Sequence, residues 1–261
     1  MTPEELRKNY NAIGIAIIED IYGTPGYLSP AGAEGTDRLA ELTKIQADDK
    51  ILDVGSGIGG PAMRLAKTHG CDVTGLDLVE SSVTLATERA AQAGIDGQVR
   101  FEAGDATAMP FDADAFSMVW SQDAWCHIPD RDTLLSECRR VLKPGGTIAF
   151  ADWLLTGDPH DRQYLDDVLS ALASPGLETL ESYKIRLASH GFTNIVAEDV
   201  SASFGAQYDA IMARLYAEKE RISDKFGARV FEIVKQKNGD IQHAFKVGQI
   251  GGGRFTATLP G

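Results

Sequence analysis

The sequence predicts an α/β protein built on a doubly wound, mostly parallel sheet. Strand-like and helix-like segments alternate from residue 51 to residue 152, which is typical of parallel strands with helices on both faces. An apolar strand at 51–54 runs into a glycine-rich turn and then into a helix at 60–69. The chain has 261 residues, of which 43% are hydrophobic, and this is enough for a large core.

The expected elements follow in chain order. Apolar periodicity predicts a helix over 3–22, and a second helix is expected over 33–44. Strands are expected at 51–54, 73–77, 98–102, 116–120 and 147–152, with helices at 60–69, 80–93, 131–142 and, less regularly, near 106–110. Beyond residue 152 we expect helices at 160–173, 178–190 and 206–234, and strands at 192–200 and near 251–258.

Composition narrows the class of protein. Its 25 basic and 38 acidic residues give a formal net charge of −13, so we expect no nucleic-acid partner. No apolar run approaches membrane-spanning length, and the first residues do not resemble a signal peptide. The three cysteines lack metal-ligand spacing and predict neither a disulfide framework nor a metal site. We therefore expect a cytoplasmic protein that binds a small molecule and no membrane.

Acidic residues stand at or near the ends of the first three strands. Asp53 precedes the glycine turn, where it can hold the turn or face an ammonium group. Asp77 can accept both hydroxyls of a ribose, Asp105 can accept from an exocyclic amine, and the backbone of Ala106 can meet a ring nitrogen. Three acids suit a cationic nucleoside better than a pyrophosphate, which points to S-adenosylmethionine. NAD with an oxidoreductase activity is the alternative.

Several motifs taken together resemble the class I S-adenosylmethionine-dependent methyltransferases. They are Asp53-Val54-Gly55-Ser56-Gly57-Ile58-Gly59, Asp77, Asp105-Ala106 and Leu142-Lys143-Pro144-Gly145-Gly146, within residues 48–155. The resemblance implies a Rossmann-like sheet of seven strands whose last strand is antiparallel. The cofactor-binding set that we expect is Asp53, Gly55, Gly57, Asp77, Leu78, Asp105, Ala106, Ser121, Gln122 and Ser29.

The chain then divides into three parts of one domain. Residues 1–47 form an N-terminal helical lid, and residues 48–155 form the cofactor-binding core. Residues 156–261 supply cap helices and the C-terminal strands that complete the same sheet. The stretch 206–234 is rich in charged and apolar residues, which suits either a homodimer face or a lid.

The end of the fourth strand carries the expected catalytic residues. Asp123 and His127 are four residues apart, so in a helical turn the carboxylate can orient the imidazole. The alternative is that Asp123 caps the turn while His127 packs passively. Ser121-Gln122-Asp123-Ala124 with His127 resembles the sarcosine/dimethylglycine and the phosphoethanolamine N-methyltransferases. That resemblance implies that Tyr10 pairs with His127 across the closed site, although Tyr10 also suits a helix core.

The resemblance is incomplete around the substrate. The stretch 168–174 lacks the arginine and aromatic residues of the phosphoethanolamine enzymes, and Trp153 stands where glycine-betaine enzymes tend to have proline. Trp125, Trp153 and Tyr183 can form a box for a methylated cation, with Tyr27 as a further substrate contact. Ordinary core aromatics are the alternative.

These observations predict direct in-line methyl transfer to a small-molecule amine of the sarcosine/dimethylglycine kind, with S-adenosylhomocysteine as product. His127 would accept the amine proton and Asp123 would stabilise the cation that forms. The apolar 168–173 stretch also suits C- or O-methylation of a larger natural-product scaffold. A non-catalytic sensor of S-adenosylmethionine is the alternative of another class.

Overall fold

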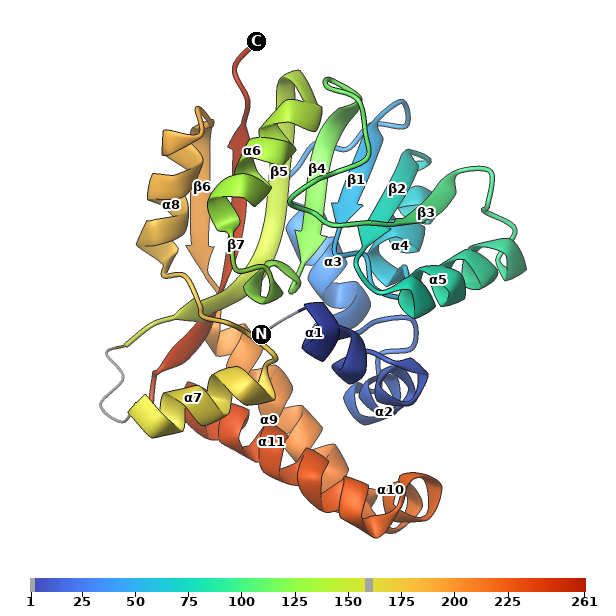
Figure 1. The fold of residues 1–261 in the computed structure, drawn as a ribbon, viewed down its shortest axis with the longest axis vertical. Helices are drawn as coiled ribbons and strands as arrows, with labels where there is room; N and C mark the ends of the chain where they lie inside the picture. Colours follow the sequence, from blue (N-terminus) through green and yellow to red (C-terminus); the bar gives the residue numbers. More distant parts are fainter. Residues whose placement is uncertain (1–2, 158–161) are drawn as a thin grey trace.

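A single seven-stranded sheet organises the computed structural model, which describes residues 3–157 and 162–261 (Figure 1). The strand order is β3-β2-β1-β4-β5-β7-β6. Only β7 runs antiparallel to its neighbours β5 and β6, and the other pairs are parallel. The strands are β1 (Lys50–Val54), β2 (Asp72–Asp77), β3 (Val99–Ala103), β4 (Phe116–Gln122), β5 (Leu142–Leu155), β6 (Thr193–Asp199) and β7 (Ile250–Thr258). The predicted fold class is confirmed.

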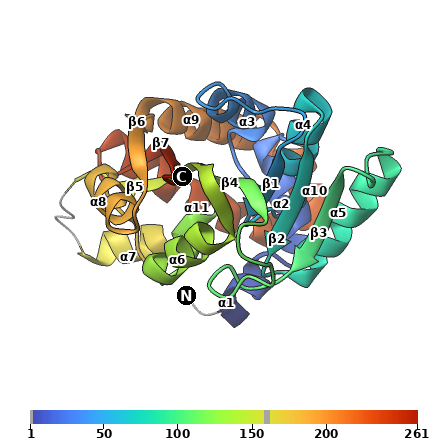
Figure 2. The ribbon, with the colours of Figure 1, turned by 90° about the horizontal axis from the view of Figure 1, so that it is seen from above.

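Helices cover both faces of the sheet (Figure 2). One apolar cluster joins it to α6 (Arg131–Val141) and α8 (Leu180–Ser189), and another joins it to α3 (Gly32–Ala40) and α4 (Gly60–His69). The central strand β1 is therefore buried on both sides, and Ile51, Leu52 and Val54 have no exposed surface. This double burial explains why β1 is a continuous apolar run without polar alternation. The helix α5 (Glu80–Gln92) follows β2 and packs on β3.

A helical cap lies beyond the carboxyl ends of the central strands, as Figure 1 shows. It consists of α7 (Arg162–Ala171), α9 (Ser201–Ala217), α10 (Lys219–Phe226) and α11 (Ala228–Lys246). A third apolar cluster joins these helices to α2 (Ala12–Tyr22) and to Trp153 of β5. The N-terminal segment and the cap therefore share one core at the end of the sheet where ligands bind in open α/β folds.

Two expected helices are broken, and the 106–110 helix is absent. The N-terminal helix is interrupted between α1 (Pro3–Asn9) and α2, because the Asn11 side chain accepts from the backbone N–H groups of Ile13 and Gly14 at 3.0 Å. The expected 206–234 helix is three helices, with a break at Gly227, whose φ is 97°.

Residues 1–2 of the expected lid and 158–161 of the expected cap lie outside the described residues. Within the described part of the chain, no helix is long and apolar enough to cross a membrane.

Glycines in β7 allow α9 to approach the sheet closely. A Cβ atom at Gly252 would lie 2.5 Å from the ring of Phe204, which is on α9. Phe204 in turn packs edge-on against Trp153, with ring centroids 5.4 Å apart. The missing side chain at Gly252 therefore sets how closely the cap docks onto the sheet.

We expect Gly252→Ala to lower the free energy of unfolding by about 1–3 kcal/mol, because the added methyl group overpacks against Phe204. Gly205→Ala is the matched control on α9, since its new Cβ would meet nothing closer than 3.6 Å. There alanine should stabilise the helix by about 0.5–1 kcal/mol. Urea unfolding followed by circular dichroism measures both; an equal effect of the two variants contradicts this account of cap docking.

Candidate active site

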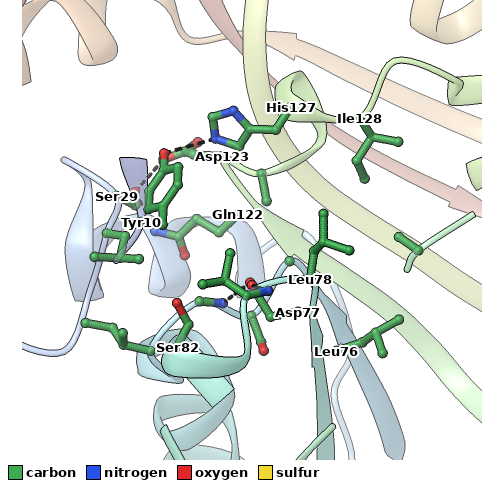
Figure 3. A pocket seen from close by; sticks show the side chains of 18 of the residues that line it. Tyr10, Ser29, Leu76, Asp77, Leu78, Ser82, Gln122, Asp123, His127 and Ile128 are labelled. Carbon is green, nitrogen blue, oxygen red and sulfur yellow. Dashed lines mark hydrogen bonds between the residues drawn. The ribbon is translucent and has the colours of Figure 1, made fainter. Parts of the chain in front are cut away.

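A cavity of about 260 Å³ opens at the carboxyl ends of β1, β2 and β4 (Figure 3). The glycine turn after β1 forms one wall, and segments after β2, β3 and β4 form others. The loop between α2 and α3 contributes the remaining side. Of the expected cofactor-binding residues, eight line this cavity: Ser29, Gly55, Gly57, Asp77, Leu78, Asp105, Ala106 and Gln122.

Asp77 holds the glycine turn in place. One carboxylate oxygen accepts from the N–H of Gly57 at 2.7 Å, and the other accepts from the N–H of Val79 at 2.9 Å. Gly57 has φ of 51° and Gly55 has φ of 76°, in the left-handed region that favours glycine. A Cβ at Gly55 would also lie 2.4 Å from that of Ala124. The turn therefore depends on its glycines and on the Asp77 side chain.

Asp53 and Ser121 lie behind the turn and outside the cavity lining. Asp53 is 1% exposed, and burial, aided by the nearby charge of Asp77, raises its pKa to about 8. The Ser121 hydroxyl is fully buried and donates to the carbonyl oxygen of Val54 at 2.7 Å. The cavity lining does not include these two side chains, because both are packed inside the sheet, where Ser121 bonds the end of β1. Their expected contact with a cofactor stays a prediction.

Asp105 and Ala106 line the cavity after β3. Oδ1 of Asp105 accepts from the backbone N–H and the hydroxyl of Thr107, at 2.8 and 2.7 Å. These bonds fix the carboxylate of an otherwise exposed side chain, next to the backbone of Ala106. A carboxylate and an adjacent backbone group suit the edge of an adenine ring, as expected from the sequence.

Gln122 fixes the loop that covers the cavity. Its amide nitrogen donates to Ser29 Oγ and to the carbonyl of Gly32, both at 3.1 Å, and its oxygen accepts from Thr36 at 2.8 Å. Ser29 in turn donates to Oδ2 of Asp123. The loop, including Tyr27, is thereby tied to the end of β4.

Tyr10 and His127 meet across the cavity, as the resemblance implied. The phenol oxygen of Tyr10 lies 3.2 Å from Nε2 of His127, and the two rings pack edge-on (Figure 3). Tyr10 reaches this position because the chain breaks between α1 and α2. The break that the sequence did not reveal therefore brings the tyrosine to the histidine.

The second imidazole nitrogen determines the tautomer. Nδ1 of His127 lies 3.0 Å from the carbonyl oxygen of Ala173, and a carbonyl can only accept, so Nδ1 must carry the proton. Burial and the charge of Arg131 keep the pKa of His127 below its usual value, although the Ala173 contact opposes this. The ring is therefore neutral, and its Nε2 lone pair accepts from Tyr10.

Asp123 lies beside this pair (Figure 3), but it does not orient the imidazole as expected, because the two ring nitrogens of His127 meet Tyr10 and the Ala173 carbonyl instead. It has φ of 56°, and one carboxylate oxygen accepts from Ser29. The other oxygen has no hydrogen-bond partner among the described residues. Burial raises the pKa of Asp123 to about 7, although the Ser29 bond acts in the opposite direction. The carboxyl group is thus poised to change charge near neutral pH.

A second cavity of about 320 Å³ meets the first at Tyr10, Leu28, Asp123 and His127. Its walls come from α2, α11, the end of α7 and single residues of β5 and α9. The lining is largely apolar and includes Ile17, Ile18, Ile21, Trp153, Leu172, Val234 and Ile241. Apart from His127, Lys237 is its one basic side chain among the described residues.

The expected aromatic box is only partly present. Trp153 lines the second cavity and Tyr27 lines the first. Trp125 instead stacks on Phe150 with ring centroids 4.1 Å apart, and Tyr183 donates to the buried carboxylate of Asp152 at 2.5 Å. The substrate contacts expected for Trp125 and Tyr183 are not supported, because both lie in the core between the sheet and α8, outside either cavity.

The sequence did not indicate two groups at this site. One is the carbonyl of Ala173, whose φ of 55° is left-handed. Alanine is not a typical turn residue, so the sequence does not indicate this conformation. The other is the set of α11 side chains in the second cavity, whose spacing also fits a surface helix.

Among the described residues, no group of three His, Cys, Asp or Glu side chains is arranged to hold a metal ion.

Several known proteins are similar to this chain. Residues 52–150 match the model of a methyltransferase domain. The chain is 31% identical over 246 residues to the 27-O-demethylrifamycin SV methyltransferase of Amycolatopsis mediterranei, covering 89% of each chain. It is 31% identical over 208 residues to the glycine/sarcosine/dimethylglycine N-methyltransferase of Actinopolyspora halophila, covering 79% of this chain and 37% of that protein.

A solved structure has a similar fold. Phosphoethanolamine N-methyltransferase 2 of Haemonchus contortus, in complex with phosphomonomethylethanolamine and S-adenosylhomocysteine, superimposes with a TM-score of 0.90 at 26% identity. The alignment covers 98% of this chain and 59% of that chain. The chain thus spans most of the first relative and less than two thirds of the two N-methyltransferases.

We expect Asp77→Ala to weaken S-adenosylmethionine binding about 5- to 150-fold, because two backbone N–H groups of the turn lose their acceptor. Asp72→Ala, at the exposed start of the same strand, is the control and should bind normally. Calorimetric titration gives both dissociation constants. Equal affinities for the two variants would contradict the role of Asp77.

Proposed function

We propose that this chain, which belongs to the S-adenosylmethionine-dependent methyltransferases, methylates an amine nitrogen of a small molecule whose other groups are largely apolar. The enzyme class follows from the family, and the acceptor is inferred from the site. The observation that carries the inference is Asp123, a half-buried carboxylate where the two cavities meet.

The first cavity fits the methyl donor. Left-handed glycines leave room for a ligand against the turn, and the carboxylates of Asp77 and Asp105 line the same space. Asp77 would face the ribose hydroxyls, while Asp105 and Ala106 would face the adenine. When bound, S-adenosylmethionine supplies an electrophilic methyl group on a positively charged sulfur, and acidic walls favour such a cation.

Asp123 distinguishes an amine from a hydroxyl acceptor. An amine attacks as a neutral lone pair and gains positive charge as the new N–C bond forms, so a neighbouring carboxylate stabilises the transition state. A hydroxyl gains negative character as it loses its proton, and the same carboxylate would oppose this. With its pKa raised to about 7, the Asp123 carboxyl group is about half ionised at pH 7 and more fully ionised above it.

His127 would act as the base. The Ala173 contact leaves its Nε2 lone pair directed at Tyr10, and burial keeps the imidazole neutral. The amine can pass its proton to the Tyr10 oxygen as the Tyr10 proton moves to Nε2. No covalent enzyme intermediate is needed, because the site has only to hold the amine in line with the methyl group.

The second cavity defines what else the acceptor carries. Apolar side chains from α2 and α11 surround it, and Lys237 is exposed. A carboxylate or phosphate on the acceptor would need a buried cation, so sarcosine, dimethylglycine and phosphoethanolamine suit this cavity less well than amines with alkyl or ring substituents.

A second candidate is O-methylation of a larger apolar scaffold, with His127 as base and Asp123 protonated. The apolar cavity favours it, and so does the similarity over most of the chain to the 27-O-demethylrifamycin SV methyltransferase. A sensor of S-adenosylmethionine without catalysis would have no use for the Tyr10–His127 contact.

Incubation with methyl-labelled S-adenosylmethionine and a library tests the proposal. The library should hold matched amines and alcohols with alkyl and ring substituents, together with sarcosine, dimethylglycine and phosphoethanolamine. We expect label on the nitrogen of apolar amines. Label on alcohols alone would replace the first candidate with the second, and label on sarcosine alone would contradict the role given to the second cavity.

We expect His127→Ala to lower kcat about 10²-fold or more, because the proton acceptor is lost. S-adenosylmethionine affinity should change little, since the glycine turn and Asp77 remain. Steady-state kinetics and calorimetric titration separate the two quantities. A loss of affinity as large as that of Asp77→Ala would contradict this division of roles.

We expect kcat to rise with pH through about 7, because Asp123 stabilises the developing cation only after it loses its proton. Below that pH the protonated form dominates and the benefit is lost. Asp123→Asn, which can still accept from Ser29, should lower the plateau of kcat and abolish this limb of the pH profile. If kcat of Asp123→Asn still rises near pH 7, the titration of another group causes that rise.

A further inference from the structure

The side chain of Arg131 is buried beneath the turn that carries His127. Arg131 is the first residue of α6 and is 5% exposed. Its guanidinium donates to the carbonyl oxygen of Ile128 and, at 3.1 Å, to that of Cys126. These carbonyls stand on either side of His127 in the chain, so one side chain fixes both ends of the turn.

The same guanidinium holds a second segment. It donates to the carbonyl oxygen of Gly176 at 2.8 Å, and the Ser174 hydroxyl bridges from this segment to the Cys126 carbonyl at 2.8 Å. Ala173, next to Ser174, supplies the carbonyl that meets Nδ1 of His127. Arg131 therefore ties the turn that bears the imidazole to the segment that orients it.

Position and burial make this arginine unusual. A cation in the first turn of a helix lies at the positive end of the helix dipole, which is unfavourable, and burial of a guanidinium costs further free energy. The carbonyl contacts of Arg131 offset these costs only while both segments stay together. If Arg131 only ended the turn before α6, an uncharged side chain could take its place.

We propose that Arg131 is a positioning residue for His127, one that locks the Nδ1–H tautomer and presents the Nε2 lone pair to Tyr10 and the acceptor. The inference rests on the base role given to His127 in the proposed function. It extends that role to a residue that lines neither cavity.

The charge of Arg131 acts on protonation as well. It adds to burial in keeping the pKa of His127 low, against the effect of the Ala173 carbonyl. Burial raises the pKa of Asp123 to about 7 and that of Asp152 to about 6. The other titratable or charged groups around the imidazole, its turn or the adjoining cavity are Tyr10, Tyr22, Asp123, Cys126, Asp130, Asp152, Tyr183, Tyr208, Lys237 and the half-buried Arg254, whose charge acts on Asp123. Among the described groups around this turn, Arg131 is the buried permanent cation.

Nuclear magnetic resonance of ¹⁵N-labelled histidine side chains tests the proposal without any acceptor. The chain has five histidines, and the spectrum of His127→Gln assigns the signal of interest. Wild-type protein should show His127 as the Nδ1–H tautomer with a pKa below the usual value of histidine. Arg131→Gln should raise that pKa, mix the tautomers and lower kcat about tenfold.

Two further variants separate charge from contacts. Arg131→Lys keeps the charge but cannot span three carbonyls as the planar guanidinium does, so it should mix the tautomers and lower kcat while the His127 pKa stays near wild type. Arg139→Gln is the control, since Arg139 is an exposed residue of the same helix, 3.3 Å from the His190 carbonyl, and should change none of these quantities.

A wild-type Nε2–H tautomer overturns the proposal, and so does an unchanged His127 tautomer in folded Arg131→Gln. Should Arg131→Gln fail to fold, the tautomer in Arg131→Lys decides in the same way. Altered tautomers in a protein that methylates no amine would overturn the proposed acceptor and leave the role of Arg131 standing.

Discussion

The contact between Tyr10 and His127 is the interaction on which the site depends. It joins the N-terminal segment to the segment that follows β4, at the place where the two cavities meet. The Ala173 carbonyl fixes the proton on Nδ1, and burial lowers the pKa of the imidazole, so the neutral ring presents its Nε2 lone pair to Tyr10. The cavity proposed for the methyl donor and the cavity proposed for the methyl acceptor therefore meet at this hydrogen bond.

Much of the fold was predictable because it rests on local signals. Glycines with positive φ, apolar strands buried on both faces and acids at strand ends each appear in the sequence as distinct residue types. Asp77, Asp105, Asp123 and His127 follow strands in the sequence, and all four line the first cavity for the same reason. Parallel strands end at one edge of a sheet, so residues that follow them must converge.

What the sequence did not reveal depends on tertiary packing. The break between α1 and α2 competes with a continuous apolar stripe, and Asn11 decides it by capping α2. Trp125 and Tyr183 are residue types that can bind a methylated cation. Both lie in the core instead, where each packs against Phe150. The supports of His127 are backbone carbonyls and a helix-initial arginine, which no residue pattern marks as part of a site.

The central claim is that the acceptor places an amine at Asp123 and its apolar groups in the second cavity. A crystal structure of the ternary complex with S-adenosylhomocysteine and a methylated amine identified by the library tests it most directly. The account predicts the nitrogen between Asp123, Tyr10 and the cofactor sulfur, with the substituents against Ile21, Trp153 and Ile241. An acceptor bound outside the second cavity, or with its nitrogen away from Asp123, would contradict it.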